Sequence, residues 1–223
     1  MIFGATRGHR SCALFRTDTY LRDRVHHRTV RLAPRLGPSV PLGITNGGRF
    51  VVLAADIGPR GAYHRLYLLD RRHGLTDLTL LLPPHRHRFW DRVYLSRNAA
   101  AIAIGVGDRT FVYHRSTGSM DLAASANLVV PRGISMDGRF MAVIDRDPGL
   151  LGPSDRGGVF RLDTATQDMA RADVLDTGPF PEDVWLYHAA MSADGSTIAF
   201  SSAPLDDSFR TQAWVRTGLP AGS

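Results

Sequence analysis

The chain has 223 residues, 43% of them hydrophobic and 22% charged, a composition typical of a globular domain and not of a disordered chain, a collagen or a coiled coil. All 27 basic residues are arginine, glutamate occurs once at Glu182, and the formal net charge is +6. The single cysteine, Cys12, excludes an intrachain disulfide framework and a thiolate zinc cage, and no apolar run is long enough to predict a membrane span.

The residue types predict an all-β chain. Lysine and glutamate normally cover exposed helix surfaces, and here they are nearly absent. The 22 glycines and 13 prolines, together with the aspartates, favour short strands joined by tight turns. The arginines are scattered along the sequence, many of them beside aspartates, so no nucleic-acid partner is expected.

Five similar units of short strands follow one another along the chain. Residues 1–35 form the first unit, with strands expected at Met1–Ala5, Asp18–Asp23 and Thr29–Ala33. Residues 36–83 form the second unit, in which a Thr-Asn-Gly-Gly turn starting at Thr45 precedes an apolar strand, and a later strand is expected at Tyr63–Asp70. The recurrence of turn and strand at a period of this kind is typical of repeat architectures.

The remaining units are expected at residues 84–125, 126–178 and 179–223. Their turns read Ser-Arg-Asn-Ala from Ser96, Ser-Met-Asp-Gly from Ser135 and Ser-Ala-Asp-Gly from Ser192. Later strands are expected at Thr110–Arg115, Gly158–Asp163 and Thr211–Arg216. An Asp-Gly or Asn-Gly pair supplies the positive φ angles of a two-residue hairpin, and the preceding serine hydroxyl can bond within the turn.

These segments resemble the blade motif of the TolB-like, WD-repeat-like β-propeller family. The best matches are Ser135–Ile144 and Ser192–Ser202, and the motif departs at Asn98-Ala99, where the glycine is lost. The resemblance covers nearly the whole chain and implies a β-propeller of about five four-stranded blades. It implies no catalytic residue, because the motif marks blades alone.

Two of the five blades are expected to be incomplete. The first lacks its inner strand, and the last lacks its outer strand after Leu186–Met191, Thr197–Ser202 and Thr211–Arg216. Propellers avoid free edges by closing, so the chain is expected to be a fragment or a mis-started reading frame of a six- or seven-bladed propeller. The alternative is a compact five-bladed ring with two thin blades. A cytoplasmic location follows if Met1 is the true start, and an envelope or secreted one if the N-terminus lies upstream.

The most unusual stretch is the loop at residues 83–91, with the candidate binding residues His85, Arg86, His87, Arg88 and Trp90. As a recognition loop, it would use Trp90 as an anchor and Arg86 or Arg88 to bind an anion. Alternatively, the loop is solvated and Trp90 packs between blades. The two histidines lack a third metal ligand in the sequence, so no metal or other cofactor is expected.

A second candidate is the acidic start of the long loop in the fourth unit, formed by Asp145, Arg146 and Asp147. Its carboxylates are either Ca²⁺ ligands or solvated acids that cap turns. Loops that join second to third strands, or one blade to the next, vary in length and share one face. Such variation is typical of a binding face.

These patterns predict a non-enzymatic propeller scaffold that binds a protein or peptide partner on its loop face. The alternative is the propeller portion of a hydrolase or lyase whose catalytic part lies outside this chain. A third hypothesis is a degraded gene product without a stable fold, for which thermal unfolding would be broad and non-cooperative.

Overall fold

The computed structural model of the protein describes residues 1–6, 17–57, 63–84, 92–107, 109–124, 130–145, 158–175, 178–179, 184–204 and 211–219. Within these ranges, strands dominate, and the helical elements are three short 3₁₀ helices, η1 (Pro34–Leu36), η2 (Asn46–Gly48) and η3 (Leu78–Leu81). The strands form five antiparallel sheets and one small hairpin, and sheet order follows chain order throughout.

Sheet 1 contains β1 (Ile2–Thr6), β2 (Thr17–Asp23) and β3 (Arg28–Arg31). Sheet 2 contains β4 (Ser39–Ile44), β5 (Phe50–Ile57), β6 (Tyr63–Asp70) and β7 (Gly74–Asp77). Sheet 3 contains β8 (Val93–Leu95), β9 (Ala101–Val106), β10 (Arg109–His114) and β11 (Ser119–Ala124). Sheet 4 contains β12 (Val130–Ile134), β13 (Phe140–Asp145), β14 (Gly158–Asp163) and β15 (Met169–Arg171). The hairpin of β16 (Val174–Leu175) and β17 (Gly178–Pro179) precedes sheet 5, which contains β18 (Val184–Met191), β19 (Ile198–Pro204) and β20 (Gln212–Arg216).

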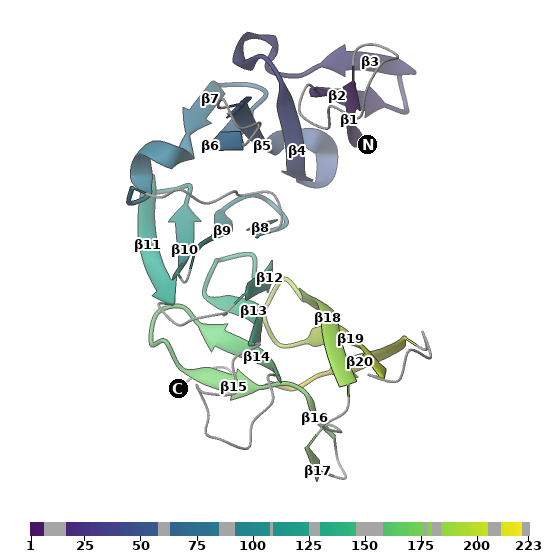
Figure 1. The fold of residues 1–223 in the computed structure, drawn as a ribbon, viewed down its shortest axis with the longest axis vertical. Coiled ribbons are helices and arrows are strands. Elements are labelled where there is room, and N and C mark those ends of the chain that lie inside the picture. Colours follow the sequence, from purple (N-terminus) through teal and green to yellow (C-terminus); the bar gives the residue numbers. More distant parts are fainter. Residues whose placement is uncertain are drawn as a thin grey trace.

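The sheets follow one another around an open arc, with sheet 1 at one end and sheet 5 at the other (Figure 1). The prediction of an all-β propeller-type chain is confirmed, and so are the three strands in the first and last sheets among the described residues. The arc does not close, which does not fit the alternative of a compact five-bladed ring. The boundaries of the five predicted units stay a prediction.

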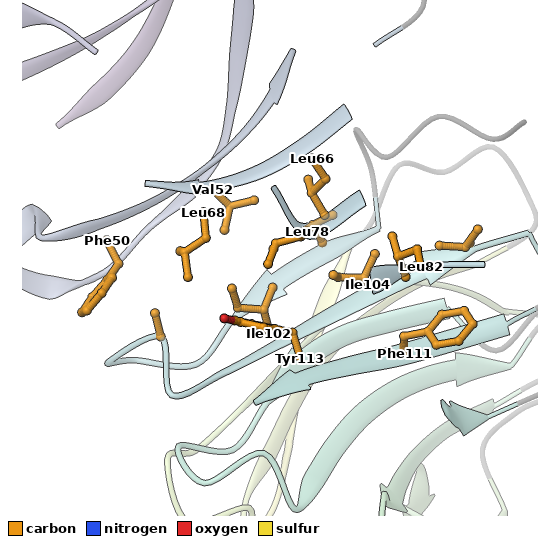
Figure 2. Packing of buried hydrophobic residues seen from close by; sticks show 13 residues of the cluster. Phe50, Val52, Leu66, Leu68, Leu78, Leu82, Ile102, Ile104, Phe111 and Tyr113 are labelled. Carbon is orange, nitrogen blue, oxygen red and sulfur yellow. The ribbon is translucent and has the colours of Figure 1, made fainter. Parts of the chain in front are cut away.

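The hydrophobic core lies between successive sheets. Between sheets 2 and 3, Val52 and Leu66 face Ile102 and Ile104, and Leu78 of η3 completes the contact (Figure 2). Val51 and Leu53 of β5 instead pack against sheet 1. Successive residues of a strand point to opposite faces, so the second strands β5 and β9, which are buried on both faces, carry the apolar runs Phe50–Ala55 and Ala101–Val106.

Four equivalent turns close the first hairpin of sheets 2 to 5. In sheet 4, Ser135 N donates to Phe140 O at 2.8 Å, and Phe140 N donates to Ser135 Oγ at 2.9 Å. The same serine hydroxyl donates to Asp137 Oδ1 at 2.6 Å, and that oxygen also accepts from Arg139 N at 3.0 Å. The predicted two-residue hairpin is therefore wrong: residue i pairs with residue i+5, because the serine and aspartate side chains bond the backbone of a longer loop.

The glycine of this turn stands at the fourth position, where the backbone is left-handed. Gly48, Gly138 and Gly195 have φ angles of 70°, 84° and 74°. Sheet 3 keeps the same conformation without glycine, since Ala99 has a φ of 54° and Asn98 Oδ1 accepts from Ala100 N at 2.9 Å. The loss of the glycine in this unit therefore leaves the turn unchanged, at a strain of about 1 kcal/mol.

The turn carboxylates predict a dependence of stability on pH. Hydrogen bonds from Ser192 and from the Ser196 backbone and hydroxyl lower the pKa of Asp194 to about 2. Because the folded-state pKa lies below the unfolded value, this stabilisation is complete above about pH 4 and is lost as the pH falls towards 2. We expect Asp194→Asn to unfold with a smaller decrease in Tm between pH 5 and pH 2 than the unmodified chain. Thermal melts across this range measure it, and a decrease in Tm as large as that of the unmodified chain would contradict this role of Asp194.

Candidate functional site

Most of the predicted binding residues lie outside the described residues. They are His85, Arg86, His87, Arg88, Trp90, Arg146 and Asp147, and their roles stay predictions. Asp145 is described as the last residue of β13, where its backbone is opposite Gly158 of β14. This places the start of the acidic candidate segment at a defined end of sheet 4.

The two ends of the sheets differ. One end, here called the turn end, carries the short turns that lead from first to second and from third to fourth strands. A Cβ placed on Gly138 would lie 2.6 Å from Ala101 Cβ, and one on Gly195 would lie 2.5 Å from Phe140 Cδ2, so each turn lies on the turn end of the preceding sheet. At the opposite end, here called the loop end, β5, β9, β13 and β19 finish and their connections to the third strands begin.

Ion pairs recur at the turn end. Arg49 Nε and Nη2 donate to the two oxygens of Asp70 at 3.1 and 2.9 Å, and Arg139 Nε donates to Asp163 Oδ2 at 3.1 Å. The Arg49 guanidinium holds the pKa of the Asp70 carboxyl well below its usual range. In sheet 3, Ala100 stands in the place of the arginine and His114 in the place of the aspartate, so both partners of the ion pair change together. That paired change was the signal in the sequence from which the pairing could have been found.

Arginines also join neighbouring sheets at the turn end. The guanidinium groups of Arg49 and Arg115 both lie over the Phe50 ring of sheet 2, at 4.7 and 4.5 Å from its centroid, and Arg115 belongs to sheet 3. Arg115 Nε donates to Ala99 O at 3.0 Å. These contacts combine cation–π attraction with a hydrogen bond to the turn carbonyl, and they bring the turn ends of sheets 2 and 3 together.

Buried Arg161 makes the corresponding link between sheets 4 and 5. Its guanidinium lies 4.4 Å from the Phe140 ring centroid, and its Nη1 donates to Leu219 O at 3.1 Å. Only 4% of the residue is exposed, and this burial lowers the pKa of Arg161. Arg161 therefore has a structural role between the sheets.

The inner strands of neighbouring sheets approach closely at bulges. β12 is bulged between Pro131 and Gly133, and a Cβ on Gly133 would lie 3.0 Å from Met191 N of sheet 5. The bulged residue, Arg132, donates from Nη1 to the Tyr94 hydroxyl of sheet 3 at 3.2 Å. β4 repeats the Pro-x-Gly pattern with its own bulge between Pro41 and Gly43. This repeated pattern was not recognised as a bulge signal in the sequence.

A buried carboxylate lies beyond β15 in sheet 4. Asp173 is 1% exposed, and Arg171 Nε donates to its Oδ1 at 3.0 Å. Burial raises the pKa of Asp173. The carboxylate and guanidinium satisfy each other within the sheet, so this pair is part of the blade packing.

Within the described ranges, no group of three or more histidine, cysteine, aspartate or glutamate side chains is placed to hold a metal ion. No helix in the same part of the chain is long and apolar enough to cross a membrane.

Comparison with known proteins gives structural neighbours only. No protein-family model matches the chain, and no curated protein matches it in sequence. A putative TolB from Agrobacterium tumefaciens is similar in structure, with 14% identity and a TM-score of 0.50, over 80% of this chain and 57% of that one. An oligogalacturonate lyase from Vibrio parahaemolyticus shares 15% identity with a TM-score of 0.55, over 88% of this chain and 55% of the lyase. Dipeptidyl peptidase 4 from Porphyromonas gingivalis shares 12% identity with a TM-score of 0.53, over 89% and 36% of the two chains.

The chain thus spans about half the length of the first two of these structures and less of the third. At identities this low, the likeness concerns the fold and carries no activity. It agrees with the arrangement of successive antiparallel sheets around an arc, and the fold of this chain is that of a β-propeller.

Proposed function

We propose that this chain is a propeller scaffold of the TolB-like repeat type, which binds a protein or peptide partner through its loop end. The observation that carries the proposal is the contrast between the two ends. At the turn end, all four first hairpins close with the same backbone pairing, from Thr45–Phe50 to Ser192–Thr197. At the loop end, the connections between second and third strands range from residues 107–108 to residues 146–157. A constant framework that carries variable connections at one end is typical of recognition surfaces.

Both candidate segments adjoin the loop end. Asp145 ends β13 there, and β8 starts there at Val93, directly after the segment that holds Trp90. Aromatic and arginine side chains supply most of the binding energy at protein interfaces, because they bury large areas and form several hydrogen bonds. Trp90 and Arg88 are therefore the residues on which binding is expected to depend most.

We expect Trp90→Ala and Arg88→Ala to weaken capture of the partner, with the tryptophan variant at least about tenfold weaker. The measurement is a pull-down with the full chain, followed by an affinity titration of the captured protein. Asp168→Ala, at an exposed position of the turn end, is the matched control and should bind as the unmodified chain does. Undiminished capture by both loop variants would contradict the assignment of residues 83–91.

The alternative function, as the propeller portion of a hydrolase or lyase, stays a prediction. Its only support is that a lyase and a peptidase have the same fold at 15% and 12% identity. A shared fold at this identity does not transfer catalytic residues.

A further inference from the structure

Six exposed arginines lie at the turn end of sheets 1, 2 and 3. This set, here called the basic turn surface, consists of Arg24, Arg28, Arg71, Arg72, Arg97 and Arg115. Arg24 and Arg28 flank the turn between β2 and β3, and the others stand in turns of sheets 2 and 3. These arginines are far apart in the sequence but close in the fold, because each repeat brings the chain back to the turn end of its sheet.

Contacts between the sheets hold these turns next to one another. A Cβ on Gly48 would lie 3.8 Å from Arg71 Nη1 and 3.9 Å from Leu21 Cδ1, so the turns of sheets 1 and 2 adjoin. The contact of the Arg115 guanidinium with the Phe50 ring joins the turns of sheets 2 and 3. The six arginines therefore form one surface along three successive sheets.

The carboxylates of this surface are already engaged. Asp23 Oδ2 lies 2.8 Å from His26 Nδ1, Asp70 accepts from Arg49, and Asp121 lies 3.4 Å from His114 Nε2. Among the described residues, no carboxylate pairs with the six arginines. Two of them donate to turn carbonyls, Arg71 to Gly48 O at 3.2 Å and Arg115 to Ala99 O at 3.0 Å. The six arginines outnumber the exposed carboxylates Asp23 and Asp121, so the surface has an excess of positive charge.

The excess of positive charge ends beyond sheet 3. In sheets 4 and 5, the exposed charged residues of the turns include the carboxylates of Asp137, Asp168 and Asp194, and the exposed Arg139 donates to Asp163. A long polymer of uniform negative charge, such as a nucleic acid, would be attracted by sheets 1 to 3 but would meet exposed carboxylates on sheets 4 and 5. A protein segment confines its acidic residues to a limited length, so it can match a surface that carries both signs.

We propose that the basic turn surface is a second docking site, which binds an acidic segment of a protein partner. It lies at the opposite end of the sheets from the loop end, so it is independent of the proposed recognition loop. An exposed arginine–carboxylate pair strengthens binding by about two- to fivefold, and several pairs together give a salt-sensitive affinity. Arginine suits this role because its fork of donors binds carboxylates with two hydrogen bonds.

The test is a titration of the full chain with a fluorescent oligoglutamate peptide and, separately, with a single-stranded oligonucleotide of the same charge. We expect the peptide to bind more tightly than the oligonucleotide and more weakly as the salt concentration rises. The double variant Arg72→Glu/Arg97→Glu should lose about tenfold or more in affinity for the peptide. Arg35→Glu, an exposed charge reversal on η1 at the loop end, should bind as the unmodified chain does.

Three results would overturn the proposal: no binding of the peptide at low salt, tighter binding of the oligonucleotide, or an equal loss of affinity in Arg35→Glu. Thermal melts confirm that each variant is folded before it is titrated. Trp90→Ala and Arg88→Ala should keep full affinity for the oligoglutamate peptide, so failure of the loop-end function and failure of this surface are distinguishable.

Discussion

Replacing Gly195 by alanine is expected to destabilise the protein by about 3 kcal/mol. Gly195 has a φ of 74°, and its new methyl group would lie 2.5 Å from Cδ2 and 2.8 Å from Cβ of Phe140. Phe140 is 6% exposed and is held by the guanidinium groups of Arg139 and Arg161. The aromatic ring therefore has little room to move, and the turn must separate from sheet 4.

Gly218→Ala is the matched control for this prediction. Gly218 belongs to the same sheet region and has a φ of 67°, but no atom of the described residues lies within 4 Å of the position of its Cβ. The control therefore includes the left-handed strain, about 1 kcal/mol, without the steric clash. Urea unfolding curves of both variants measure the difference. An equal loss of stability in the two variants would show that backbone conformation alone selects glycine in this turn.

Arg161→Ala is expected to destabilise the protein by about 3 to 5 kcal/mol. The substitution removes the contact with the Phe140 ring and leaves Leu219 O, which accepts from Arg161 Nη1, without this donor. It also leaves an internal space, because the residue is 4% exposed. For a chain of this length, the Tm should fall by roughly 6 to 20 °C.

Arg49→Ala provides the comparison, at a more exposed arginine that also lies over a turn phenylalanine. Arg49 also lies over a phenylalanine ring, at 4.7 Å, but 37% of its side chain is exposed. Water can replace most of its interactions, so its removal should cost clearly less than the removal of Arg161. Thermal melts at neutral pH compare the two variants, and a larger loss at Arg49 would contradict the structural role assigned to the buried arginine.

The strands could be predicted well from the sequence because each one combines an apolar run with a recognisable turn. Tyr63–Asp70 and Gly158–Asp163 are both predicted and observed with the same bounds. The turn geometry was predicted wrongly, since a two-residue hairpin is the usual consequence of Asp-Gly. Here the side chains of Ser135 and Asp137 bond the backbone and hold a longer loop, and such bonds depend on atoms that a residue pattern does not locate.

The positions of charged side chains in the fold were harder to predict than the positions of the strands. Arg24, Arg72 and Arg97 are far apart in the sequence, and only the stacking of sheets puts their turns at one end. The Arg49–Asp70 pair was missed for a similar reason, because its partners stand on different strands. The predicted binding residues at 85–90 lie outside the described residues, so they remain hypotheses based on residue type.

The division of the core into separate layers has a consequence for unfolding. Each apolar cluster connects one sheet to the next, so the free energy of the chain is close to a sum of contributions from single sheets and from adjacent pairs. In such a linear array, a terminal member has one neighbour and an internal member has two. Sheet 3 packs against sheet 2 on one side and sheet 4 on the other, so its strands are expected to be among the last to lose their protection from solvent.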